Sequence, residues 1–192
     1  MKSFIFIFIF GLFFSLHAGV EESVTTMMIN NSQKVTTILK DKGISKTRQD
    51  VELIKLVDPL FDFNLMGTLC LGKATYAALS EDQKTKFHTV FNKKIKNSYT
   101  GKLHLYTDEK LEFEKAKIVK DKRMMLQSYL ITKTEKKSVV YKFYEADNKK
   151  WLIYDVDIFG VSIVQTYRNQ FAAALKTKSF EQFLLELNTD AI

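Results

Sequence analysis

The amino-acid sequence predicts an α+β domain: a helical N-terminal half, a curved four-stranded antiparallel sheet, and closing C-terminal helices. Three observations lead to this prediction. Apolar residues recur at helical spacing as far as about residue 101, alternate between about residues 111 and 158, and return to helical spacing after Gly160. Only one proline and seven glycines occur among 192 residues, so we expect long elements joined by short turns.

The first eighteen residues have the organisation of a secretory signal peptide. Lys2 gives a positive start, residues 4–14 are largely apolar, and Ala18 is a small residue suited to cleavage. A membrane-spanning helix needs roughly 20 apolar residues, which is longer than this run. We therefore expect residues 1–18 to be removed and residues 19–192 to form a single domain.

Four helices are expected in the first half of the mature chain. Gly43, Pro59 and Gly72 supply stop signals between them, and Thr47 is expected to begin the second helix with Asp50 at its capping-box position. Ser80 and Gln83 have the spacing of a capping box that opens the fourth. The expected helices cover about residues 24–39, 47–58, 63–70 and 80–101.

The second half is expected to form a meander of four strands followed by two helices. The strands are rich in β-branched and aromatic residues and are separated by short polar turns, which favour antiparallel pairing. They span Leu111–Val119, Arg123–Thr134, Ser138–Ala146 and Lys149–Ile158. Helices follow at about residues 163–175 and 180–187, the last with Ser179 as its cap. A curved sheet against helices leaves either a packed core or a cavity, and the pattern does not distinguish them.

Charge and cysteine content narrow the possible functions. Removing residues 1–18 removes one lysine and no acid, which leaves 28 basic and 22 acidic side chains and a net charge of +6. The basic residues are spread along the chain rather than clustered, as on an ordinary solvated surface, and if they have a partner, an anionic membrane surface is nearer to hand than nucleic acid. Cys70 is the single cysteine and lies far from the cleavage site, so we expect neither a lipid anchor nor an intrachain disulfide.

Few residues are arranged for catalysis or metal binding. His88, His104 and Cys70 are too few for a zinc site, and a Cys70–His88 dyad is less favoured than a buried structural thiol. Asp155 and Asp157 share one strand face but also suit a solvent-facing strand end. Phosphate-binding glycine loops and nucleophile elbows are absent from the sequence. We therefore expect no catalytic residue, no metal and no cofactor.

Two stretches resemble a known family. Val57–Phe63, then Leu71-Gly72, Phe87, Phe91 and Tyr99, are similar to the N-terminal signature of the toluene-tolerance or MlaC-type periplasmic phospholipid-binding proteins. Trp151–Val156, Gly160–Val164 and Tyr167–Phe171 are similar to the C-terminal signature of that family, and the matches span about residues 57–187.

The resemblance implies a soluble periplasmic carrier with a fold similar to a nuclear-transport-factor-like cone. Phospholipid would be its cargo, with acyl chains between sheet and helices. Its partners would be an inner-membrane ABC transporter complex with a membrane-anchored lipid-binding subunit and an outer-membrane lipoprotein–porin complex. Such a protein acts as a monomer, binds no nucleic acid and helps to maintain outer-membrane lipid asymmetry.

The aromatic and aliphatic stripes are therefore candidates to line an apolar cavity, although each residue singly also suits a packed core. The candidate lipid-binding residues are Phe63, Met66, Leu69, Phe91, Ile95, Tyr99, Tyr129, Tyr141, Phe143, Trp151, Ile153, Val161, Val164, Tyr167 and Phe171. The alternative is a small exported enzyme or a polar-ligand binding module on the same fold. That alternative would use Asp155, Asp157 or His88.

Overall fold

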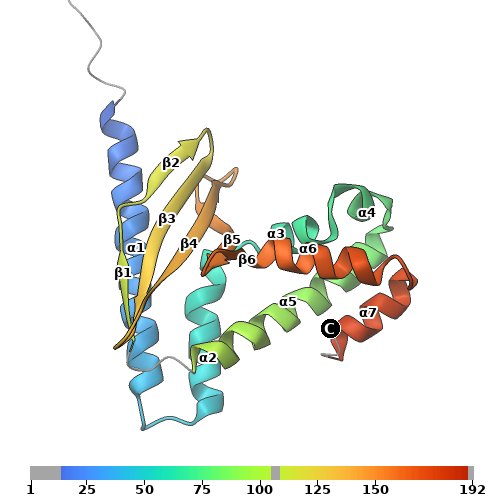
Figure 1. The fold of residues 1–192 in the computed structure, drawn as a ribbon, viewed down its shortest axis with the longest axis horizontal. Coiled ribbons are helices and arrows are strands. Elements are labelled where there is room, and N and C mark those ends of the chain that lie inside the picture. The colour runs from blue at the N-terminus through green and yellow to red at the C-terminus, as the bar shows by residue number, and fades with distance from the viewer. Residues whose placement is uncertain (1–13, 105–108, 190–192) are drawn as a thin grey trace, which may run out of the picture.

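In the computed structural model, which describes residues 14–104 and 109–189, the chain forms a sheet lobe and a helical lobe (Figure 1). In the sheet lobe α1 (Phe14–Lys40) lies along the sheet. The helical lobe contains α3 (Phe63–Leu71), α4 (Lys73–Ala78), α5 (Glu81–Leu103), α6 (Ile163–Ala174) and α7 (Phe180–Asn188). Most of the predicted signal peptide falls outside the described residues. Within them, no helix has the length and apolar character to cross a membrane.

The α+β class is confirmed, and local sequence signals explain the helix boundaries. The Ser80–Gln83 capping box opens α5, and an equivalent box formed by Ser179 and Gln182 opens α7. Gly72 ends α3 at φ 80°, a backbone conformation that favours glycine. The predicted start of the second helix was wrong, because Ser45 rather than Thr47 caps α2 (Lys46–Val57).

Between α2 and α3 the chain forms a short 3-10 turn, η1 (Asp58–Leu60), which places Pro59 inside a helical turn. The short helix α4 was not predicted from the sequence. It follows Gly72 directly and spans only six residues, too few for a clear period of apolar residues.

The sheet has six strands and is open, so the prediction of four strands was wrong in number. The strands are β1 (Lys110–Phe113), β2 (Lys117–Lys120), β3 (Arg123–Ile131), β4 (Lys136–Glu145), β5 (Trp151–Ile158) and β6 (Val161–Ser162). Their order is β1-β3-β4-β5-β6, and β2 also pairs with β3; the pairings between these strands are antiparallel.

A bulge divides the predicted strand Leu111–Val119 into β1 and β2. Phe113 pairs with Ser128 and Lys117 pairs with Met125. The three residues between Phe113 and Lys117 therefore face only two residues of β3, which is the pattern of a bulge. At the bulge and in β2, α1 covers the free edge of this strand. The Ala116 N–H donates to Thr25 Oγ1 at 2.9 Å, and the Ile118 N–H donates to Glu21 Oε1 at 2.7 Å. These contacts satisfy edge donors that would otherwise invite pairing with another chain.

The buried side chains form two separate cores. The helical-lobe core contains residues such as Phe87, Phe91, Phe171 and Phe183, packed in stacked and edge-to-face contacts. The sheet-face core lies between α1 and the inner face of the sheet. Its buried members are Val24, Met28, Ala116, Met124, Leu126, Val139, Phe143, Ile153 and Val156.

Phe61 and Ile163 pack against both cores and so mark the junction of the two lobes. Backbone contacts also join the two lobes at this junction. Phe61 forms a parallel bridge with Ile153, and the Asp62 N–H donates to the Ile153 carbonyl at 2.9 Å. Asp62 also caps α3 and accepts a hydrogen bond from the Tyr144 hydroxyl. The start of α3 is thereby fixed to the strands β4 and β5.

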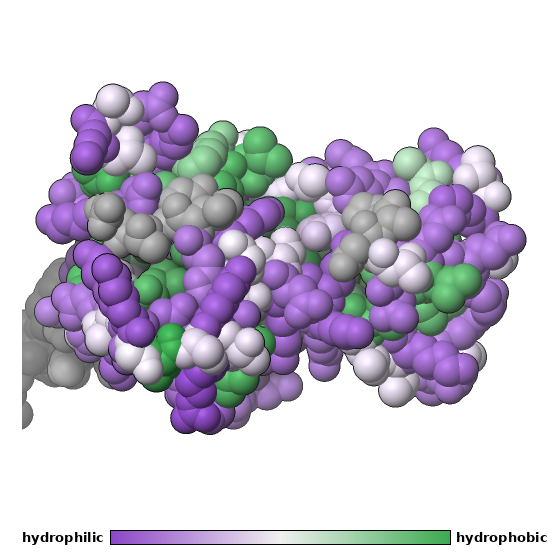
Figure 2. Space-filling view, turned by 90° about the horizontal axis from the view of Figure 1, so that it is seen from below, coloured by the Kyte–Doolittle hydropathy of each residue, from purple (hydrophilic) through white to green (hydrophobic). Residues whose placement is uncertain are grey.

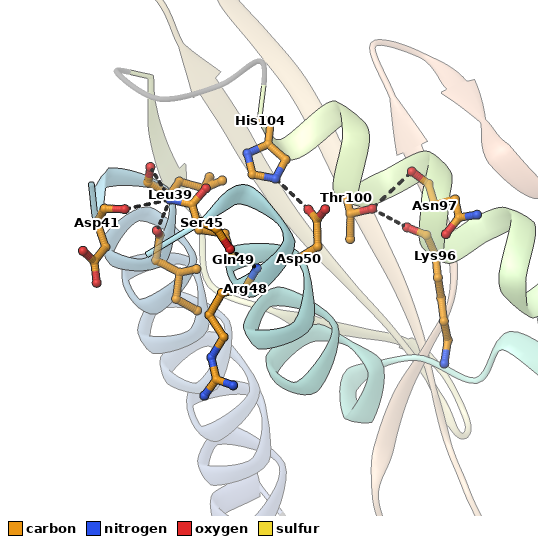
Figure 3. A network of polar contacts seen from close by, with 11 residues as sticks. Leu39, Asp41, Ser45, Arg48, Gln49, Asp50, Lys96, Asn97, Thr100 and His104 are labelled. Atoms are coloured by element: carbon orange, nitrogen blue, oxygen red, sulfur yellow. Dashed lines mark hydrogen bonds and ion pairs between the residues drawn. The ribbon is translucent and has the colours of Figure 1, made fainter. Parts of the chain in front are cut away.

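Polar contacts fix the C-terminal end of α1 to the rest of the molecule (Figure 3). The Gln49 side-chain amide on α2 donates to the Ile38 and Asp41 carbonyls at 3.0 and 2.9 Å. On the other side of α2, His104 Nε2 lies 2.7 Å from Asp50 Oδ1, which ties α2 to the end of α5. The C-terminal end of α1 is therefore anchored by α2, whereas its N-terminal half rests on the sheet.

Candidate functional site

The inner face of the sheet presents apolar side chains to α1, and Leu60 of η1, Phe61 just before α3 and Ile163 of α6 pack against the same core. Alternate residues of a strand point to the same face, so Met124 and Leu126 on β3 lie beside Tyr141 and Phe143 on β4. Val24 and Met28 on α1, one helical turn apart, pack against this surface and are 5% and 6% exposed.

A hollow of about 370 Å³ lies where the N-terminal half of α1 meets the turn between β4 and β5. Val20, Val24 and Trp151 give it apolar walls, and Glu145 and Lys149 lie at its charged rim. Its remaining lining residues are Gly19 and Ser23. Val24 belongs to the sheet-face core and Trp151 packs against it, so the hollow adjoins the core directly. This seam between α1 and the sheet is the candidate site.

A second hollow, of about 290 Å³, lies on the opposite face of the sheet. Its walls combine polar side chains, among them Glu114, Lys115, Lys117 and Gln127, with the apolar side chains of Val119, Met125 and Val140. The Tyr129 hydroxyl in this hollow donates to Glu114 Oε1 at 2.9 Å. Seen from below, the molecule is largely hydrophilic, and its hydrophobic residues form separated patches (Figure 2). None of the residues that line this second hollow belongs to the sheet-face core or packs against it, so the second hollow does not adjoin that core.

The structure divides most of the predicted lining residues between the two cores. Nine of them belong to the helical-lobe core or pack against it: Phe63, Met66, Leu69, Phe91, Ile95, Tyr99, Val164, Tyr167 and Phe171. Four belong to the sheet-face core or pack against it: Tyr141, Phe143, Trp151 and Ile153. Tyr129 lies on the outer face, and Val161 is 58% exposed beside β6.

The residues of α1 at the seam were not among the predicted lining residues. Val20, Val24 and Met28 follow the four-residue spacing of one helix face, which was visible in the sequence from Val24 onward. That spacing indicates a buried face, but it does not say which element buries it.

Asp155 has a structural environment rather than a catalytic one. It is 4% exposed and accepts hydrogen bonds from the Lys142 Nζ at 2.8 Å, the Ser162 hydroxyl at 2.7 Å and the Val164 N–H at 3.1 Å. These three donors come from β4, β6 and the first turn of α6. The carboxylate therefore fixes the start of α6 to the sheet, and its oxygens are directed at these donors.

His88 is likewise engaged inside the helical lobe. Its Nε2 lies 3.0 Å from the Tyr76 hydroxyl, and burial lowers the pKa of its imidazole. His88, Asp155 and Asp157 line neither of the two hollows described above. These three side chains therefore lie outside the candidate site. Across residues 14–104 and 109–189, no group of three His, Cys, Asp or Glu side chains is placed to hold a metal ion.

We predict that Cys70 is unreactive in the folded protein. It is fully buried, and that burial raises the pKa of its thiol to about 12. At pH 8 its thiolate fraction should be lower than that of a free cysteine by roughly three orders of magnitude. A thiol-specific chromogenic reagent should label Cys70 rapidly in guanidinium chloride and very slowly in native buffer. Prompt labelling of the native protein would contradict its place in the core.

Comparison with known proteins gives two findings. A model of the family described as MlaC protein matches residues 29–189. The fold resembles the solved structure of the phospholipid-binding protein from Ralstonia solanacearum in complex with a phospholipid, with a TM-score of 0.71 and 22% sequence identity. That match covers 86% of this chain and 97% of the Ralstonia chain, and at this identity it establishes similarity of fold. No curated protein matches the chain.

Proposed function

The chain belongs to the MlaC protein family, and from this premise we propose that it is a carrier that binds a phospholipid between α1 and the inner face of the sheet. The observation that carries the proposal is the sheet-face core, an apolar surface on which α1 packs and which adjoins a hollow beside Trp151. The similar fold of the Ralstonia protein, solved with a phospholipid, supports the same class of ligand.

Binding would require α1 to move away from the sheet. The hollow of about 370 Å³ lies near the lower end of pockets that hold drug-sized ligands, roughly 300–1,000 Å³, and a two-chain phospholipid is larger than most such ligands. Thr25 and Glu21 tie the N-terminal half of α1 to the strand edge by single hydrogen bonds, whereas Gln49 anchors its C-terminal end. We infer that the N-terminal half swings outward and that acyl chains replace its contacts with the core.

The energetics of acyl-chain burial favour a carrier that docks before it releases its cargo. Two acyl chains contain about 30 methylene groups, each worth roughly 0.8 kcal/mol on leaving water. The gross gain of about 24 kcal/mol exceeds the practical limit of non-covalent affinity, about 18 to 21 kcal/mol. Release into water would therefore be extremely slow, and transfer has to proceed from one apolar environment to another.

We propose that this transfer takes place in the periplasm. In this proposal residues 1–18 direct export and are removed, and the mature chain moves as a monomer between membranes. Its partners are an inner-membrane ABC transporter complex with a membrane-anchored lipid-binding subunit and an outer-membrane lipoprotein–porin complex. The net charge of +6 on residues 19–192 suits acidic partner surfaces or anionic lipid. Transfer between these sites would maintain outer-membrane lipid asymmetry.

The test of phospholipid binding is extraction of the exported protein with organic solvent followed by mass spectrometry. We expect about one phospholipid per chain in the extract. The same protein, delipidated and refolded, should take up labelled phospholipid from vesicles. Empty protein that also fails to take up labelled lipid would contradict the proposal.

A further inference from the structure

The turn between β4 and β5 places a lysine where the backbone favours glycine. Lys149 has a φ of 63°, in the left-handed region, where a side chain with a Cβ meets a steric penalty that glycine avoids. The turn is well defined: the Lys149 N–H donates to the Ala146 carbonyl at 2.9 Å, and the Lys150 N–H donates to Asn148 Oδ1 at 3.1 Å. Lys149 lines the hollow beside α1, so its unfavourable conformation occurs at the candidate site.

The neighbouring turn also has a lysine at a position with positive φ. Lys122, between β2 and β3, has a φ of 54°, and its carbonyl accepts a hydrogen bond from the Glu145 N–H at 3.2 Å. Among the described residues outside glycine, only Lys122, Lys149 and Phe159 have positive φ. Two of the three are therefore lysines in adjacent turns at one end of the sheet. The charged residues of these two turns and their flanks are Lys120, Asp121, Lys122, Arg123, Glu145, Asp147, Lys149 and Lys150.

The ammonium group of Lys149 is placed to meet an incoming anion. Its side chain is 77% exposed, and its Nζ lies 3.5 Å from Glu145 Oε1. That separation is longer than the roughly 2.7–2.9 Å of a strong charge-assisted hydrogen bond. Arg123, by contrast, lies over the rings of Tyr144 and Tyr154 on the outer face of the sheet. Lys149 is thus the one cation among the described residues that line the hollow, and it lies beside the one carboxylate, that of Glu145.

The hollow offers apolar walls for the acyl chains of a phospholipid and a charged rim for its phosphate. Val20, Val24 and Trp151 offer apolar contacts to acyl chains. The phosphate cannot follow the chains inward, because burying an unpaired charge is costly. It would remain at the rim, where Lys149 can pair with it. Cleavage after Ala18 would add the α-ammonium of Gly19, which also lines this hollow.

We propose that Lys149 at the rim of this hollow, assisted by Lys122 from the adjacent turn, binds the headgroup phosphate of the carried phospholipid and gives the carrier a preference for anionic headgroups. The proposal rests on the proposed function, and it adds the residues and the charge class that determine cargo selection. Zwitterionic headgroups carry a cation that competes with these lysines for the phosphate, so they gain less from the rim.

The test compares the lipids that the exported protein takes up from vesicles containing equal amounts of phosphatidylglycerol and phosphatidylcholine with identical acyl chains. After equilibrium the protein is separated from the vesicles, and its bound lipid is quantified by mass spectrometry. We expect enrichment in phosphatidylglycerol. In the variant Lys149→Gly Lys122→Gly this enrichment should fall by about fivefold for each lysine that contacts the phosphate. Glycine suits both backbone positions, so the variant should remain folded.

A control variant and added phosphate distinguish the effect of Lys149 and Lys122 on lipid selection from the effect of the protein's net charge. The variant Lys133→Gln Lys176→Gln loses the same charge at the opposite end of β3 and β4 and in the helical lobe, and it should keep the enrichment. Millimolar inorganic phosphate should leave the enrichment unchanged, because free phosphate lacks acyl chains. An unchanged lipid ratio in Lys149→Gly Lys122→Gly, or loss of enrichment in the control variant or in phosphate, would overturn the inference. Failure of the parent protein to acquire either lipid would instead overturn the proposed function.

Discussion

Joining α1 to the sheet by a disulfide should abolish phospholipid uptake. The substitutions Thr25→Cys and Ala116→Cys place thiols at positions whose Oγ1 and backbone N are 2.9 Å apart. Contacts of this kind are compatible with the Cα separation of about 4.4–6.8 Å that a disulfide bridges. The oxidised protein would hold the N-terminal half of α1 on the strand edge, so acyl chains could not reach the sheet-face core. Uptake of labelled phospholipid from vesicles measures the effect.

Reduction provides the internal control for this experiment. Dithiothreitol should restore uptake in the double variant and should have no effect on the single variant Thr25→Cys. Cys70 is buried and its thiol pKa is raised, so it should not compete for the new thiols. Full uptake by protein that is quantitatively cross-linked would contradict an entrance between α1 and the sheet.

Replacing Asp155 with alanine should lower the free energy of unfolding by about 3–5 kcal/mol. The Lys142 side chain is only 26% exposed, and the substitution leaves its ammonium group without the carboxylate that pairs with it. The substitution also removes the acceptor of the Val164 N–H. It also removes the partner of the Ser162 hydroxyl. Urea unfolding followed by circular dichroism would measure the change.

Two variants test whether the ion pair is responsible. Asp157→Ala, two residues along the same strand at a partly buried position, should change the free energy of unfolding by less than about 0.5 kcal/mol. Adding Lys142→Met to Asp155→Ala should recover part of the loss, because it removes the unpaired charge. A loss below about 1 kcal/mol in Asp155→Ala would mean that this carboxylate does not fix α6 to the sheet.

The elements that the sequence predicted well are those with local signals. The capping box at Ser80, the cap at Ser179 and the stop at Gly72 depend on residues close in sequence, and the structure confirms them. Two ordered motifs were also sufficient to suggest the family, which the match over residues 29–189 confirms. Local chemistry and motif order are both readable without knowledge of the tertiary packing.

The features that could not be predicted depend on distant partners. The break between β1 and β2 lies where Ala116 and Ile118 bond to Thr25 and Glu21, 91 and 97 residues earlier in the chain. The alternation of apolar and polar residues within Leu111–Val119 does not indicate where this break lies. The sheet is open. The nuclear-transport-factor-like cone that the family resemblance implies therefore stays an expectation.

The candidate site was only partly readable for the same reason. Helical and strand periods show that a face is buried, but not which core receives it, so residues such as Phe91 and Phe143 were grouped together although they lie in different cores. On β3 both faces carry apolar residues, as Met124 and Met125 illustrate with exposures of 1% and 37%. The positive φ of Lys149 has no signal in the sequence, because lysine rarely marks such a position.

The most direct test of the account uses Trp151, the single tryptophan of the sequence, which lines the hollow beside α1. The exported protein is loaded with a phospholipid that carries brominated acyl chains, separated from vesicles, and compared with protein loaded with the unbrominated lipid. Bromine quenches tryptophan emission on contact, so we predict strong quenching of Trp151 by the brominated cargo. Equal emission from both preparations, with bound lipid confirmed by mass spectrometry, would contradict a site between α1 and the sheet.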